Sequence, residues 1–135
     1  MDRTAPALAP ALMALGRLLI SVIFLWDGAG LIAAPGPSIA YIATSALPFP
    51  TIAYAGAVAV QLLGGAALLV GWRARWAAAA LAAFCVATAL FFHDDFANLD
   101  MEIHFFKNLA MAGGLLQIVA AGGGAWSLDG RRSKR

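Results

Sequence analysis

Three polar residues, His104, Lys107 and Asn108, lie inside an apolar stretch long enough to cross a membrane. Their spacing of three and four residues places them on one face of a helix. Ionisable groups are costly within a bilayer, where they are usually paired or functional. An imidazole can move a proton, ligate a metal or donate a hydrogen bond. The triad therefore predicts either a buried ion pair or a small-molecule site.

The chain around this triad has the composition of an integral membrane protein. Of its 135 residues, 62% are hydrophobic and 12% are charged, and the mean hydropathy is +0.82. A soluble domain usually carries about a quarter of charged residues. We therefore expect the polar triad to belong to a membrane-spanning element.

Four segments are apolar enough, and close enough to about 20 residues in length, to cross a bilayer. They leave only short loops, so the sequence predicts one domain over residues 1–135 and no separate soluble module. The expected fold is all-α, a transmembrane four-helix bundle. Its predicted helices are residues 11–33, 51–71, 76–92 and 103–121.

Basic residues predict the orientation, because cytoplasmic loops hold the excess of lysine and arginine. The second loop contains Arg73 and Arg75 and the carboxyl tail contains four basic residues, whereas the first and third loops contain none. Both termini are therefore expected to be cytoplasmic. Topology and lipid contact explain the net charge of +2, so no nucleic-acid partner is predicted.

Alternating helix direction and a rise of about 1.5 Å per residue bring polar groups from three helices to one depth. Asp27 lies near the outer end of the first span and His93 ends the third. His104, Lys107 and Asn108 open the fourth. These five residues form a predicted outer polar layer.

Two readings of this layer remain open. Asp27 and Lys107 form a structural ion pair in the first, whereas in the second they line a pocket that binds or protonates a small molecule. Gln61 lies deeper, about halfway down the second helix, and joins the five residues of this layer as a candidate ligand-binding residue. Arg17 and Gln117 fall at similar depth in the inner leaflet, where they are predicted to pair between helices, or Arg17 to extend toward the membrane surface.

Metal and dithiol chemistry are not predicted. The two histidines and the acidic residues near them are separated by a loop without metal-site spacing. Cys85 is the only cysteine and lies midway along the third span, so a dithiol–disulfide cycle within one chain is impossible. A buried apolar role suits it.

Other segments have structural readings. The middle of the first loop, residues 38–47, is expected to form about two turns of interfacial helix, with Tyr41 and Phe49 at the outer surface. The second loop, WRARW, is read as a headgroup anchor, with a specific anionic-lipid site as the less favoured alternative. Two glycine pairs are read as close-packing seams between helices, namely Gly64 with Gly65 and Gly113 with Gly114.

Three stretches resemble the DoxX family of small four-helix membrane proteins. They are GRLLISVIFLWDGAG from Gly16, the GG-containing second span, and above all HFFKNLAMAGGLL from His104. The resemblance extends from about Leu15 to Asp129.

The resemblance implies a bacterial inner-membrane protein related to the DoxD subunit of thiosulfate:quinone oxidoreductases. Members are linked as membrane subunits to sulfur-compound oxidation or oxidative-stress defence. The polar positions of the family pattern carry Arg17, Gln61, His104, Lys107 and Asn108 in this sequence. Many relatives have an acidic residue at the position of Gln61, and they commonly have lysine at the position of Leu31. A buried ion pair of the family is therefore expected to be replaced by neutral partners.

Two functional hypotheses follow. One is a quinone-linked redox subunit, in which Lys107 or His104 donates a hydrogen bond to a quinone carbonyl and Asp27 or His93 exchanges protons. Its electrons would come from a partner protein, because the chain has no cofactor motif and no cysteine pair. The other is a non-enzymatic bundle that binds or moves a lipid or small apolar solute, or that scaffolds a membrane complex. A homo-oligomer is compatible with both.

Overall fold

The computed structural model describes the backbone of residues 5–133 and the side chains of residues 8–133, and every regular element in that range is helical. Four helical segments are long and apolar enough to cross a membrane, which confirms the predicted all-α class. The second of them is continuous through three helical segments. The elements are α1 (Ala5–Ala33), α2 (Pro35–Ala43), α3 (Pro50–Ala59), η1 (Val60–Gly64), α4 (Gly65–Val70), α5 (Ala74–Phe92), α6 (Leu99–Ala121) and α7 (Leu128–Arg132).

The four spans end within one residue of the predicted positions but begin earlier, and the cause is clear at α6. The side chain of Asn98 caps this helix by accepting a hydrogen bond from the amide of Asp100 at 3.0 Å. Asp100 and Glu102 then occupy the first turn, where negative charge suits the positive end of the helix dipole. The end of the acidic loop therefore belongs to α6, four residues before the predicted start at residue 103.

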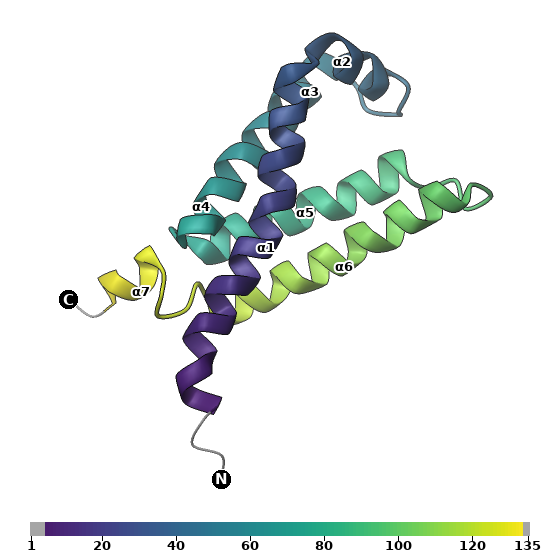
Figure 1. Cartoon of the computed structure of the whole chain (residues 1–135). Coiled ribbons are helices and arrows are strands. Elements are labelled where there is room, and N and C mark those ends of the chain that lie inside the picture. Colours follow the sequence, from purple (N-terminus) through teal and green to yellow (C-terminus); the bar gives the residue numbers. More distant parts are fainter. Residues whose placement is uncertain (1–4, 134–135) are drawn as a thin grey trace.

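The spans are arranged as two pairs (Figure 1). α1 packs along α3, η1 and α4, and α5 packs along α6 as an antiparallel hairpin. The pairs cross near the α4–α5 turn, where α5 also contacts η1 and α4, and they diverge toward the end that carries α2. Groups at equal depth in the two pairs can therefore lie far apart.

The core lies at the crossing. Leu68, Leu81, Cys85 and Leu115 are fully buried there, so Cys85 has the predicted structural role. Three of the four predicted seam glycines also make close approaches, whereas Gly113 has no neighbour within 4 Å and is not a seam. A Cβ atom would lie 3.2 Å from the Leu81 side chain at Gly64, 3.2 Å from the Leu25 side chain at Gly65, and 3.2 Å from the Ile20 side chain at Gly114.

The predicted interfacial helix of the first loop is present as α2, shifted toward the proline at its start. Pro35 occupies a first-turn position, where its missing amide hydrogen costs nothing. Tyr41 of α2 stacks on Phe92 at the end of α5, with ring centroids 5.5 Å apart. This contact joins the two diverging pairs at their open end, and Phe49 is exposed there, as expected for the membrane surface.

Candidate functional site

His93 and His104 are brought together by the α5–α6 turn. Their rings stack with centroids 5.1 Å apart. The Nδ1 atom of His93 lies 3.5 Å from the sulfur of Met101, and the Nε2 atom of His104 lies 3.6 Å from Oδ2 of Asp100. Part of the predicted outer layer is thus one cluster at the mouth of the α5–α6 hairpin.

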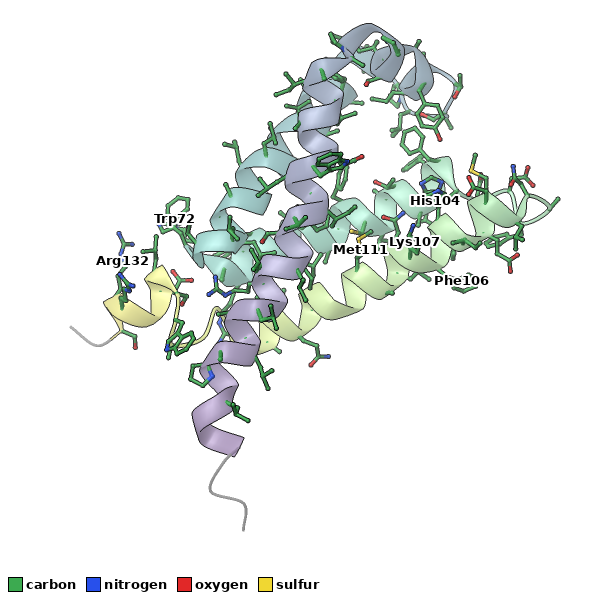
Figure 2. The ribbon with its side chains drawn as sticks, viewed as in Figure 1. Trp72, His104, Phe106, Lys107, Met111 and Arg132 are labelled. Carbon is green, nitrogen blue, oxygen red and sulfur yellow. The ribbon has the colours of Figure 1, made fainter. Side chains whose placement is uncertain are left out.

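The polar triad of α6 separates into three environments. Asn108 is buried and donates from Nδ2 to the carbonyl oxygen of His104 at 3.0 Å. His104 is half-buried and Lys107 is exposed. Figure 2 shows His104 and Lys107 on one side of α6 and Phe106 on the other. The polar face of α6 runs from Asp100 to His104 and then to Lys107, which lies one helical turn further into the span.

Asp27 and Lys107 do not form the ion pair that was one of the two open readings of the outer layer. Across the described side chains, the only salt bridge joins His104 and Asp100. The contact between α1 and α6 is at Ile20 and Gly114, and both charged residues lie about two helical turns beyond it, where the helices have diverged. Asp27 and Lys107 are therefore both exposed, and equal depth did not bring them together.

Gln61 is buried halfway along the second span, at the depth that the sequence predicts. It lies in η1, a π-helical turn, and such turns are frequent at functional sites. A Cβ atom at Gly28 would lie 3.2 Å from the Gln61 Cβ and 2.8 Å from Leu62, so α1 presses directly on this turn. The Nε2 atom of Gln61 has no hydrogen-bond partner among the residues described. It is an available donor inside the protein.

The predicted pair of Arg17 and Gln117 is also wrong. The guanidinium of buried Arg17 instead donates to the carbonyl oxygens of Leu68 and Leu69 at 3.0 and 2.8 Å, and to that of Trp126 at 2.5 Å. Gln117 is exposed on another face of α6. Carbonyl oxygens in the last turn of α4 lack helical donors. A charged guanidinium forms stronger hydrogen bonds with them than with a neutral amide side chain.

A network of polar contacts that was not predicted from the sequence lies at the end of the molecule that carries the α4–α5 turn. Arg75 donates to the last carbonyls of α6, at Val119 and Ala120, over 2.6 and 2.5 Å. The carboxylate of Asp129 accepts from the amides of Arg73 and Ala74, both at 2.8 Å, and thereby caps α5. Each charge meets the helix end of opposite polarity. The SLDG segment after the last span, a capping pattern, was the available signal.

Lowering the pH is expected to weaken the histidine cluster. Burial lowers the pKa of His93 from its ordinary 6.5, the charge of His104 acts in the same direction, and Asp100 opposes both. A histidine whose pKa is lower in the folded protein than in the unfolded chain contributes its full stabilisation at a pH above the unfolded-state pKa. This contribution is lost as the pH falls through the folded-state pKa. The melting temperature in detergent should therefore fall as the pH drops below 6.5. His93→Phe keeps a ring against His104 and should flatten this dependence; an unaltered slope would contradict the assignment.

No group of three or more histidine, cysteine, aspartate or glutamate side chains converges in the described range. The outer cluster brings together imidazole and carboxylate groups, which can form hydrogen bonds and exchange protons.

Comparison with known proteins connects this arrangement to a family. The DoxX family profile matches residues 12–94, from within α1 to just past the end of α5. The inner membrane protein YqjF of Escherichia coli (strain K12) is 31% identical over 119 residues, covering 88% of this chain and 90% of YqjF. The inner membrane protein YphA of the same organism is 28% identical over 131 residues, covering 93% of each chain. No solved structure matches.

The profile match ends before α6, so the motif from His104 lies outside it, although both relatives align over most of the chain. The matched relatives and the four apolar helices agree on a multi-pass inner-membrane protein. The chain belongs to the DoxX family.

Proposed function

We propose that this DoxX protein is a membrane subunit of quinone-linked redox chemistry, of the kind associated with sulfur compounds or oxidative stress, and that α6 holds the quinone headgroup. Lys107 carries the proposal. Its ammonium lies within an apolar span, is exposed, and makes no salt bridge in the described part of the chain. An unpaired ammonium at such a position favours a ligand that supplies the missing acceptor.

The donor set suits a quinone. A quinone has two carbonyl oxygens that accept hydrogen bonds and, when bound, supplies electron and proton acceptance. Lys107 offers up to three N–H donors, and the imidazole of His104 lies one turn away on the same face. Asn108 already donates to the His104 carbonyl, so it positions this turn of α6. A planar headgroup could enter from lipid, because Lys107 is not covered by the chain.

Proton exchange would use the outer part of the same face. The side chain of Asp100 is 79% exposed and that of His104 is 42% exposed, with 3.6 Å between Oδ2 and Nε2. Asp100 can exchange a proton with water and pass it to His104 Nε2. Lys107 follows one turn deeper. This route replaces the predicted roles of Asp27 and His93 in proton exchange.

Electrons would come from a partner protein. Cys85 is the one cysteine of the chain, and it is fully buried in the core. A dithiol relay within one chain therefore has no basis, and the subunit's role is to bind and protonate.

Lys107→Met is expected to weaken binding of a short-chain ubiquinone about tenfold, which corresponds to the loss of one charge-assisted hydrogen bond. Binding is measured by absorbance difference on protein in zwitterionic detergent. Gln117→Met is the matched control, since it places the same side chain at an exposed position deeper on α6 and should bind like wild type. Equal affinity of wild type and Lys107→Met would refute the proposal.

A lipid is the second candidate, because an exposed lysine in an apolar helix can also extend toward a headgroup phosphate. Mass spectrometry of material copurified with wild type and Lys107→Met separates the two. A phospholipid lost in the variant, with no quinone in either sample, would favour the non-enzymatic lipid-binding function.

A further inference from the structure

A second candidate site lies at the opposite end of the spans, beside the α4–α5 turn. A cavity of about 560 Å³ that is widely open to the surroundings is lined there by residues of this turn, by the glycine loop after α6, and by the segment around α7. Figure 2 shows Trp72 and Arg132 at this end, away from His104 and Lys107. This volume is within the usual range for small-ligand pockets, about 300–1,000 Å³.

Two arginines give the cavity its positive charge. Arg75 is fixed by its bonds to the carbonyls of Val119 and Ala120, which involve Nη1 alone. Its Nη2 and Nε atoms face Gly122, where a Cβ atom would come within 3.4 and 3.5 Å of them. Glycine at this position leaves the second edge of the guanidinium uncovered. That edge offers parallel N–H donors, the geometry that suits a phosphate.

Arg73 has an unusual backbone. It adopts the left-handed conformation with φ +46°, which glycine or asparagine would occupy more readily. Its guanidinium lies over the Trp72 ring, 5.6 Å from the centroid, and forms no salt bridge within the described range. A strained position that nevertheless carries an arginine indicates a use for the side chain.

The one carboxylate in the wall is already occupied. Asp129 accepts from the amides of Arg73 and Ala74, at the start of α5. It stabilises the start of α5, and with two guanidinium groups against one carboxylate the wall keeps an excess of positive charge. Gly123 and Gly124 also line the cavity, and their amides donate to no acceptor in the described range.

Tryptophans place the cavity at headgroup level. Trp72, Trp76 and Trp126 are all exposed at this end, and α4, α5 and α6 all begin or end here. Exposed tryptophans beside helix ends mark the interface between hydrocarbon and water. A phosphate at this depth is supplied by lipid.

We infer that this cavity, with Arg73, Arg75 and the loop Gly122–Gly124, binds the phosphate of an anionic phospholipid headgroup. The site is separate from the proposed quinone site, and neither requires the other.

Arg73→Gly tests the inference, because glycine fits φ +46° and the fold should be retained. In native mass spectrometry with added phosphatidylglycerol, we expect affinity to fall about fivefold, the value of one arginine near a membrane surface. Phosphatidylcholine should bind weakly to wild type and variant alike. Arg132→Ala removes an equal charge from the same end but outside this cavity, and should retain wild-type affinity.

Three results would overturn the inference: unchanged phosphatidylglycerol affinity in Arg73→Gly, an equal loss in Arg132→Ala, or equal binding of the two lipids by wild type. Inorganic phosphate is tested in parallel. If it binds with the same dependence on Arg73 while phosphatidylglycerol does not, the ligand is free phosphate and the lipid source is wrong. Melting temperatures of both variants confirm that folding is unaffected.

Discussion

Arg17→Ala is expected to lower the free energy of unfolding by about 3 kcal/mol, because buried backbone carbonyls would lose their charged donor. The carbonyl of Leu68 would keep one partner, the amide of Gly71 at 3.1 Å. Those of Leu69 and Trp126 would lose the contacts of 2.8 and 2.5 Å. The bond to Leu68 is buried and those to Leu69 and Trp126 are part-buried, so water can replace the lost donor only in part.

Unfolding of purified protein by increasing SDS in mixed micelles measures this loss. Gln117→Ala is the control, since its side chain is exposed and the change should stay within about 0.5 kcal/mol. Arg17→Lys should be intermediate, because one ammonium cannot reproduce the fork that reaches α4 and the carboxyl-terminal segment together. Equal effects of Arg17→Ala and Gln117→Ala would restore the predicted pairing of those two residues.

The spans were predictable because hydrophobic length is a property of the sequence itself. The four predicted segments coincide with the four apolar helices, and α2 forms where the first-loop prolines and apolar residues predict it. Gly64, Gly65 and Gly114 were recognisable as seams because close approach demands small residues. The orientation with cytoplasmic termini stays a prediction from the basic loops.

The side-chain pairings were less predictable, because depth along a helix says nothing about lateral position. Asp27 and Lys107 share a depth but belong to pairs that diverge, so their predicted contact is absent. Arg17 donates to backbone carbonyls, and which carbonyls can accept depends on where α4 ends. The proximity of His93 and His104 was easier to predict, since a short turn keeps the ends of two consecutive helices together.

Gly71→Ala is expected to destabilise the protein by about 3 kcal/mol. Alanine would be strained in the left-handed backbone conformation of this position, and its Cβ atom would collide with Ser127. Gly71 has φ +70° and ends α4. An added Cβ atom would collide with the Cβ of Ser127, and would lie 2.8 Å from Nη1 of Arg17 and 3.1 Å from the Cα of Ser127. The carboxyl-terminal segment would have to move away from the turn.

Two measurements check this result. SDS unfolding gives the free energy, and trypsin should cleave after Arg131 and Arg132 faster, because the amide of Asp129 would lose its 3.0 Å bond to the carbonyl of Gly71. Gly56→Ala is the matched control within the same span. It has no neighbour within 4 Å of the added atom, so it should be neutral or slightly stabilising. Equal stability of the two variants would contradict the docking of this segment.

The two largest effects should not add, because both substitutions disrupt one junction. Arg17 contacts the end of α4 and Trp126, and the Cβ atom of Gly71→Ala would press on Arg17 and Ser127 together. Once Gly71→Ala has displaced the segment, the guanidinium has already lost Trp126. The double variant should therefore lose less than the sum of the single losses, by at least about 0.5 kcal/mol, the size expected of residues in contact. Strict additivity would mean that α1 and the carboxyl-terminal segment stabilise the α4–α5 turn independently.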